Sequence, residues 1–197
     1  DVRILPGLSQ ADPADVMRGE ETQIAGYLAQ NAEYYGVLCL PGTHSKWVRI
    51  QGGGVQGFST YMTGELFSLI SRQSVLRLTL NAADPDPEAA RKAALDAIAD
   101  PHAPLRELFA LRAGALLHDL TPQQAAGRLS GLMIGAELGA TRHLWQDQKT
   151  IIIGAPELAA LYQTPLQAAG ADATQMDGGQ LVLAGLTSAR LALQERP

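Results

Sequence analysis

Cysteine, aromatic residues and long apolar runs are all scarce in this sequence. A single cysteine, Cys39, occurs among 197 residues, which excludes an internal disulfide framework and a cysteine-rich metal site. Because Cys39 stands inside an apolar run, we expect it to be a small buried hydrophobic residue. Aromatic residues make up only 5% of the chain, whereas alanine, leucine and glycine are abundant. The core is therefore expected to consist of small aliphatic side chains on packed helices.

Several partners and locations are disfavoured by the same composition. No apolar stretch approaches the roughly 18 residues that a membrane-spanning helix needs. The formal net charge of −5 disfavours non-specific binding of nucleic acid. The first residues show no basic segment followed by an apolar one. We therefore expect a cytoplasmic protein whose partner is neither a membrane nor a nucleic acid.

The stretch with the strongest pattern runs from Gly36 to Ile50. An apolar run is followed by the small polar turn 42–45 and then by residues that alternate with period two, which predicts a hairpin with strands near 37–41 and 46–50. Successive N–H groups in such a turn form a concave anion site. Thr43 and Ser45 add hydroxyls and Lys46 adds a positive charge. We interpret this turn as a phosphate-binding hairpin, with an ordinary solvated turn as the alternative.

Two acidic residues open the helix predicted from about Gly19 to Glu33. Ile24 and Tyr27 lie on one stripe of this helix, and Glu20 and Glu21 lie in its first turn. Carboxylates are favoured at a helix N-terminus for electrostatic reasons alone. The functional alternative is that one of the two faces a cleft as a general base beside Arg18.

The order of the remaining elements predicts the fold class. Residues 2–6 are predicted as a short strand and residues 8–14 as a polar loop. Further strands are expected near 55–60, 149–154 and 172–176, and helices near 62–79, 87–99, 105–118, 121–145, 156–169 and 179–194. The inner face of the helix 62–79 is assigned to Leu66, Leu69, Ile70 and Leu76. The last two strands follow crossover connections and should be parallel to the first strand of the hairpin.

This order predicts an α/β, ribonuclease-H-like lobe with a mixed five-stranded sheet, in which three antiparallel strands are followed by two parallel ones. Ligands of such open sheets bind beyond the carboxyl ends of the strands. The turn at Gly42 and the strand end at Gly154 should therefore border the same edge.

The helix predicted for residues 121–145 carries a glycine at every fourth position from Gly127 to Gly139. Such a stripe favours a close approach to another helix or to the sheet. Glu137 within it is interpreted as a solvated or paired charge, with a site residue as the alternative. His102 and His118 have no partners at metal-ligand spacing and are expected at the surface, so no protein metal site is predicted.

Four segments carry a family resemblance that covers nearly the whole chain. They are residues 15–23 (DVMRGEETQ), 40–47 (LPGTHSKW), 62–67 (MTGELF) and 129–137 (LSGLMIGAE). They resemble the signatures of 2-dehydro-3-deoxygalactonokinases, which belong to the actin/hexokinase/Hsp70-like superfamily. The sequence also has the order of landmarks found in related sugar kinases, namely Gly19-Glu20, then Gly42-Thr43, then Gly154.

The resemblance implies ATP-dependent phosphorylation of the terminal hydroxyl of 2-dehydro-3-deoxy-D-galactonate, with Mg²⁺ bridging the phosphates. Glu20 resembles the catalytic acid of related kinases, and Glu21 remains the alternative. Arg18 and Gln23 would bind the sugar acid. The implied phosphate-binding residues are Gly42, Thr43, His44, Ser45 and Lys46. Gly154 and Ala155 would lie behind the adenosine.

One expected motif is missing. Kinases of this superfamily carry a first phosphate loop, similar to Asp-x-Gly-Thr-Thr, in a separate N-terminal lobe, and we find no such segment here. The chain also opens without a methionine. The resemblance therefore implies that residues 1–18 are the end of a preceding lobe or linker. Residues 19–197 would be the C-terminal lobe, with a helical insertion at about 80–121.

Without the missing lobe the chain is expected to be inactive. The alternative function is a non-catalytic nucleotide-binding or assembly module. A metal-dependent nuclease of ribonuclease-H type is disfavoured, because no carboxylates stand at the strand positions that it needs. A homodimer through the helix from Met62 or the glycine-striped helix is an alternative to burial of both within the lobe.

Overall fold

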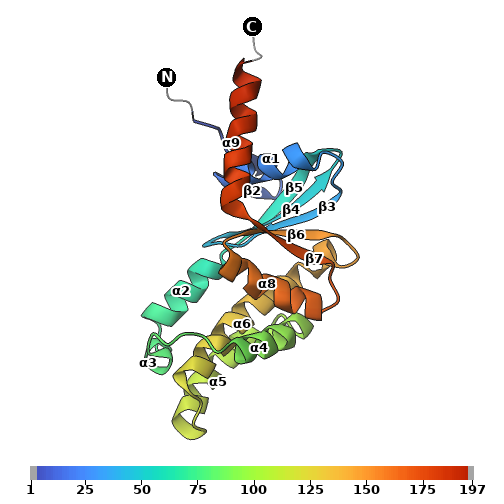
Figure 1. Cartoon of the computed structure of the whole chain (residues 1–197). Coiled ribbons are helices and arrows are strands. Elements are labelled where there is room, and N and C mark those ends of the chain that lie inside the picture. Colours follow the sequence, from blue (N-terminus) through green and yellow to red (C-terminus); the bar gives the residue numbers. More distant parts are fainter. Residues whose placement is uncertain (1–3, 195–197) are drawn as a thin grey trace.

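The computed structural model describes residues 4–194. A five-stranded sheet is covered by helices on both faces, and a group of helices extends away from it on one side (Figure 1). In spatial order the strands are β5 (Gly54–Tyr61), β4 (Ser45–Gln51), β3 (Gly36–Leu40), β6 (Thr150–Gly154) and β7 (Ala173–Asp177). The expected α/β class with a mixed five-stranded sheet is confirmed.

The strand pairing places the two predicted landmarks at one edge of the sheet. β3 pairs antiparallel with β4, and β4 pairs antiparallel with β5. β6 pairs parallel with both β3 and β7. Leu38 in β3, for example, lies between Val48 in β4 and Ile151 in β6. Because β3 and β6 are parallel neighbours, the turn that follows Leu40 and the chain that follows Gly154 leave the sheet at the same edge.

Two helices cover one face of the sheet, α1 (Glu20–Gln30) and α9 (Gly178–Gln194). Ile24 and Tyr27 of α1 and Leu181 of α9 share a buried cluster with sheet residues such as Leu38. The two helices cross closely, since a Cβ atom at Gly26 would overlap Leu181 O and one at Gly185 would overlap Thr22 O. This contact fixes the start of α1 beside the carboxyl edge of the sheet.

The opposite face is covered by α6 (Pro122–Ala140), α7 (Arg142–Trp145) and α8 (Pro156–Ala168). Leu138, Trp145 and Tyr162 pack there against Trp47 and Cys39 of the sheet. Cys39 is fully buried, as expected, and burial raises the pKa of its thiol.

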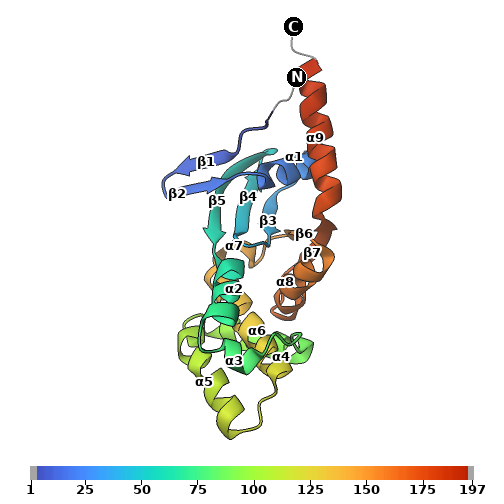
Figure 2. The same ribbon diagram turned by 90° about the vertical axis from the view of Figure 1, so that its left-hand side faces the viewer.

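The remaining helices build a helical part beyond α6, as Figure 2 shows from the side. They are α2 (Thr63–Gln73), α3 (Arg77–Leu80), α4 (Pro87–Ala99) and α5 (Ala103–Leu117). The glycine stripe of α6 explains how α4 approaches it. A Cβ atom at Gly127, Gly131 or Gly135 would overlap a backbone oxygen of the α4 segment, those of Asp86, Ala90 and Ala94 respectively. The predicted close helix contact is therefore confirmed.

The N-terminal residues are organised differently from the prediction. Residues 8–14 were predicted as a loop, but β1 (Leu8–Ala11) and β2 (Ala14–Met17) form an antiparallel hairpin. The strand predicted at 2–6 lies partly outside the described residues, and Ile4–Gly7 have no regular structure. The hairpin lies over β5, and its last residue, Met17, is buried in the core on that side of the sheet. Gln10 Nε2 donates to Phe58 O (3.2 Å), and Phe58 N donates to Gln10 Oε1 (3.1 Å).

Two predicted helices are shorter than expected. The helix predicted at 62–79 ends at Gln73, and the short α3 follows after Ser74. Of the residues assigned to its inner face, Leu76 is buried and Ile70 packs against the helical core, as expected. Leu66 and Leu69 are exposed, because Phe67 faces that core in their place. The helix predicted to reach Trp145 ends at Ala140, before α7. Among residues 4–194, no helix combines the length and apolar character needed to cross a bilayer.

The α4–α6 contact gives a first testable expectation. Gly135→Ala adds a methyl group that would overlap Ala94 O, so we expect it to lower the free energy of unfolding by about 1–3 kcal/mol. This loss should appear although alanine favours helices more than glycine. Gly54→Ala, where no atom lies within 4 Å of the added Cβ, is the control. Equal stability of the two variants in urea unfolding would contradict the close contact.

Candidate functional site

A cleft of about 400 Å³ opens at the carboxyl edge of β3 and β6. Its walls come from the N-terminal part of α1, the turn after β3, the end of β6 and the start of α8. Eleven residues line it: Glu20, Gln23, Leu40, Pro41, Gly42, Thr43, His44, Ile153, Gly154, Ala155 and Leu158. Seven of these were predicted as site residues from the sequence.

The turn after β3 presents unused backbone donors to this cleft. No hydrogen bond within residues 4–194 engages the backbone N–H of Gly42, Thr43 or His44. The space around Gly42 is open, since the nearest atom to an added Cβ would be His44 O at 3.7 Å. Three successive N–H groups in such a turn suit a bound anion.

The N-terminal turn of α2 holds this loop in place. A Cβ atom at Gly64 would overlap Gly42 O, so only glycine allows the two backbones to lie this close. Glu65 N donates to Thr43 O (2.9 Å). His44 Nε2–H donates to the Glu65 carboxylate, and this pair lies at the solvent-exposed rim. The side chain of His44 is thereby oriented across the mouth of the cleft.

The two acidic residues of α1 differ in position. Glu20 Oε2 accepts a hydrogen bond from Arg18 N (3.1 Å), and Glu21 Oε2 accepts one from Gly19 N (2.6 Å). Both therefore cap the helix N-terminus, as carboxylates do on electrostatic grounds. Only Glu20 also lines the cleft. The side chain of Arg18 is exposed and, like Glu21, is not part of the cleft lining.

Gln23, Gly154 and Ala155 form the opposite part of the cleft. Gly178, the first residue of α9, lies against this wall, because its Cβ position is 3.3 Å from Gly154 Cα and 3.0 Å from Gln23 Nε2. Helices α1 and α9 and strand β6 therefore converge at one point beside the turn.

Ser45 and Lys46, which were also predicted to bind phosphate, do not line the cleft. Both belong to β4, where successive side chains point to opposite faces of the sheet. Ser45 is fully buried, and its hydroxyl donates to Glu137 Oε2 (3.1 Å). Lys46 is 5% exposed, and its ammonium donates to Val16 O (2.9 Å) and Thr60 Oγ1 (2.8 Å).

Glu137 also differs from its interpretation as a solvated or paired charge. It is 3% exposed, and its carboxylate accepts from three neutral groups: Ser45 Oγ, Trp47 Nε1 (2.7 Å) and Tyr162 OH (3.0 Å). Burial raises the pKa of Glu137, whereas hydrogen bonds from Thr63, Trp47, Tyr162 and Ser45 act in the opposite direction. The net direction is upward, because burial is the stronger effect.

A smaller apolar pocket of about 180 Å³ adjoins the cleft and shares Gly42 and Leu158 with it. Phe67, Met133 and Leu161 supply much of its surface. The cleft and this pocket together offer polar and apolar surface on either side of Gly42.

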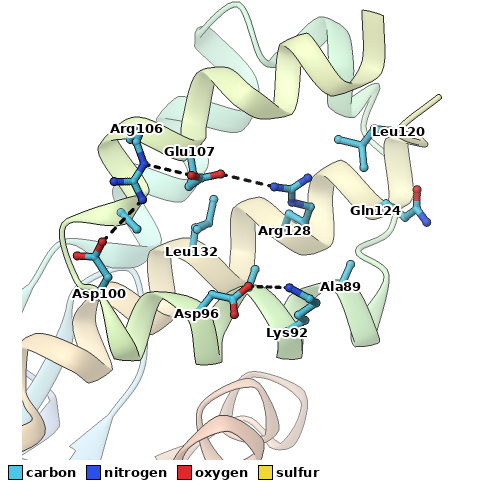
Figure 3. A pocket seen from close by; sticks show the side chains of 12 residues that line it. Ala89, Lys92, Asp96, Asp100, Arg106, Glu107, Leu120, Gln124, Arg128 and Leu132 are labelled. Atoms are coloured by element: carbon cyan, nitrogen blue, oxygen red, sulfur yellow. Dashed lines mark hydrogen bonds and ion pairs between the residues drawn. The ribbon is translucent and has the colours of Figure 1, made fainter. Parts of the chain in front are cut away.

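A larger groove of about 540 Å³ lies between α4, α5 and α6 and is a weaker candidate site (Figure 3). Its cations are already paired with acids: Lys92 with Asp96, Arg106 with Asp100 and Glu107, and Arg128 with Glu107. Exposed pairs of this kind leave no unbalanced charge for a ligand.

Comparison with known proteins identifies the family of the chain. The family described as 2-keto-3-deoxy-galactonokinase matches residues 1–189 of the chain. The chain belongs to the 2-keto-3-deoxy-galactonokinase family.

Relatives of known name support this membership. A protein of Rhizobium meliloti (strain 1021), described as a probable 2-dehydro-3-deoxygalactonokinase, is 42% identical over 98% of this chain and 65% of its own length. The 2-dehydro-3-deoxygalactonokinase of Escherichia coli (strain K12) is 38% identical over 95% of this chain and 64% of its own length. A crystal structure from Sinorhizobium meliloti that carries the same enzyme name superposes with a TM-score of 0.92 at 39% identity, over 98% of this chain and 66% of that chain. The chain thus spans about two thirds of the length of the family members that it matches.

Several residues that line or adjoin the cleft of this family member had no predicted role. Gly64 and Glu65 stood within a recognised signature, but their contact with the turn joins segments about 20 positions apart. Leu158 and Gly178 carried no signal at all, because each is an ordinary residue at the start of a helix. Only their tertiary neighbours identify them.

The contacts of Lys46 give the second expectation. Lys46→Met removes two hydrogen bonds that tie β4 to Val16 and Thr60, so we expect a loss of about 1–3 kcal/mol in the free energy of unfolding. Hydrogen exchange of the β1–β2 amides should also accelerate. Lys149→Met, at an exposed lysine, is the control. If both variants unfold at the same urea concentration, the Lys46 contacts do not stabilise the hairpin.

Proposed function

We propose that the protein phosphorylates the terminal hydroxyl of 2-dehydro-3-deoxy-D-galactonate with ATP, giving the 6-phosphate in galactonate breakdown. The observation that carries this proposal is a cleft lined both by the carboxylate of Glu20 and by the turn 42–44, whose three N–H groups have no hydrogen-bond partner within residues 4–194. Family membership and the names of the relatives support the substrate and the reaction.

The cleft fits the phosphates of a nucleotide. Phosphoryl transfer depends mainly on positioning and charge stabilisation. The N–H groups of Gly42, Thr43 and His44 would receive the terminal phosphate oxygens, and the Thr43 hydroxyl would add a further donor. Gly154 and Ala155 would lie behind the adenosine. The adjoining pocket lined by Phe67 and Met133 is apolar enough to hold the adenine ring.

Mg²⁺ fits this cleft only as an ion held mostly by phosphates and water. Within residues 4–194, no three His, Cys, Asp or Glu side chains gather into a metal site. Mg²⁺ commonly binds through one or two carboxylates together with substrate phosphates. Because Glu20, the carboxylate in the cleft lining, is proposed below as the base, the ion would be held here by the phosphates and by water and would neutralise phosphate charge.

Glu20 is the proposed general base. It would take the proton of the substrate hydroxyl while that oxygen bonds to the terminal phosphorus and the bond to the leaving ADP oxygen breaks. Glu20 is preferred to Glu21 because Glu21 is outside the cleft lining. Gln23, which lines the cleft, and Arg18, which precedes Glu20 by two residues, are proposed to bind the sugar acid. Arg18 would pair with the carboxylate of the sugar acid.

We further propose that this chain is the ribonuclease-H-like C-terminal lobe of a two-lobed kinase. The strand pairing and the one third of relatives' length that the chain does not span support this. Residues 1–18 would lead in from the other lobe, which would complete the cleft. Helix α9 exposes Leu183, Leu186 and Leu191, an apolar surface suited to contact with that lobe. A homodimer remains a prediction.

A non-catalytic nucleotide-binding module is the second candidate, because both Glu20 and Glu21 already serve as helix caps. The two candidates differ in what happens when the carboxylate of Glu20 is removed.

Glu20→Gln in the full-length protein separates them. We expect kcat to fall by about 10²-fold or more, since the base is lost, while the affinity for Mg·ADP is retained. Glu21→Gln removes the neighbouring cap and is the matched control, with kcat nearly unchanged. Equal rates for both variants and the wild type would contradict the role of Glu20.

Gly64→Ala tests the phosphate turn. The added methyl would push against Gly42 O, so we expect a weaker affinity for Mg·ADP, by about tenfold, measured by calorimetry. Gly114→Ala in α5 adds the same methyl far from the cleft, beside the flexible side chain of Leu120, and is expected to bind as the wild type does. Unchanged affinity in a folded Gly64→Ala protein would exclude this turn as the phosphate site.

A further inference from the structure

We propose that Glu137 is a positioning residue for the turn 42–44: its buried carboxylate ties the strand that follows the turn to α6 and α8 and thereby fixes the backbone donors for ATP. This inference rests on the proposed function, in which the turn binds the terminal phosphates.

The carboxylate of Glu137 is a junction of separate elements. Glu137 belongs to α6, and Ser45 and Trp47, which donate to it, belong to β4. Tyr162 donates from α8, and its hydroxyl also lies 2.9 Å from Ser45 Oγ. The carboxylate thus joins α6, β4 and α8.

One of these donors directly adjoins the turn, because Ser45 follows His44 in the chain. A change in the position of the Glu137 carboxylate therefore moves the start of β4, which supports the turn from its C-terminal side. Tyr162 and Thr63 also line the apolar pocket that is proposed to hold the adenine ring of ATP.

The hydrogen bonds to the Glu137 carboxylate fix the positions and orientations of their donors. Within residues 4–194, no cation forms an ion pair with Glu137. The titratable groups near it are Cys39, Tyr61 and Tyr162, which are neutral at ordinary pH. Hydrogen bonds to a carboxylate are shorter and stronger than those between neutral groups, and they are directional. Apolar packing at this place would fill the space without fixing the orientation of the Ser45 hydroxyl.

The test uses Ser45→Ala, Glu137→Gln and the double variant in the full-length protein, with KM for ATP, KM for the sugar acid and kcat as readouts. Glutamine keeps the size of the side chain and one acceptor for Trp47. We expect each single change to raise KM for ATP by about threefold to tenfold, with KM for the sugar acid unchanged. KM for ATP in the double variant should not exceed the larger of the two single-variant values, because both changes break the same connection.

Tyr34→Phe is the control for a merely structural effect. Its buried hydroxyl donates to Val37 O (2.9 Å) and Lys149 O (2.8 Å) at the other end of β3. We expect this variant to lose thermal stability without any change in KM for ATP. Ser45→Ala removes a single hydroxyl, so it keeps the test valid if Glu137→Gln does not fold.

Three results overturn the positioning role: an unchanged KM for ATP, an equal rise in both KM values, or additive effects in the double variant. Failure of the proposed function is a separate result, seen as a wild-type protein that does not phosphorylate the sugar acid. The affinity for Mg·ADP is then the readout. A weaker affinity for Mg·ADP in Ser45→Ala and Glu137→Gln, but not in Tyr34→Phe, supports the role. Equal affinity in all variants, or a wild-type protein that does not bind Mg·ADP, overturns it.

Discussion

The first two residues of β4 are held from opposite faces of the sheet, and the candidate site depends on this arrangement. The Ser45 hydroxyl donates to Glu137 in the helical layer below, and the Lys46 ammonium donates to Val16 O in the hairpin above. The turn 42–44 ends where this double attachment begins. Its backbone N–H groups can therefore stay without internal partners, because the flanking strand supplies the rigidity that hydrogen bonds within the turn would otherwise give. The same Lys46 contact fixes β2, which leads directly into Arg18 and Glu20, so one strand orients both walls of the cleft.

Close approach of backbones is the second constraint on this architecture. At Gly64 it brings α2 against the turn, and at Gly135 it brings α4 against α6. The small aliphatic core noted in the sequence is the counterpart of these contacts, since alanines of α4 such as Ala97 face the glycine stripe. The helical part is thereby attached to the sheet through α6, the helix that also carries Glu137.

The sequence was informative where local pattern decides structure. Alternating and apolar runs located β3, β4 and β6 to within a residue or two, and the small polar turn at Gly42 was found at the edge where the cleft lies. The pattern failed where tertiary contacts decide. The hairpin β1–β2 shows no clear alternation of apolar and polar residues, and it is held over β5 by hydrogen bonds of Gln10 and Asp15 and by the burial of Met17. Ser45 and Lys46 looked like ligands because they follow the turn, but strand alternation directs them to opposite faces. Glu137 carried no local sign of its partners, which lie 25 to 92 positions away.

Hydrogen–deuterium exchange of the full-length protein with and without Mg·ADP tests the central claim most directly. We expect protection of peptides covering residues 40–46 and 153–156 at the cleft, with no change over 89–107 in the groove of α4 and α5. That result would place the nucleotide at the turn after β3. Protection confined to the α4–α5 peptides, with the turn unchanged, would contradict the claim that the unpaired N–H groups of residues 42–44 bind phosphate.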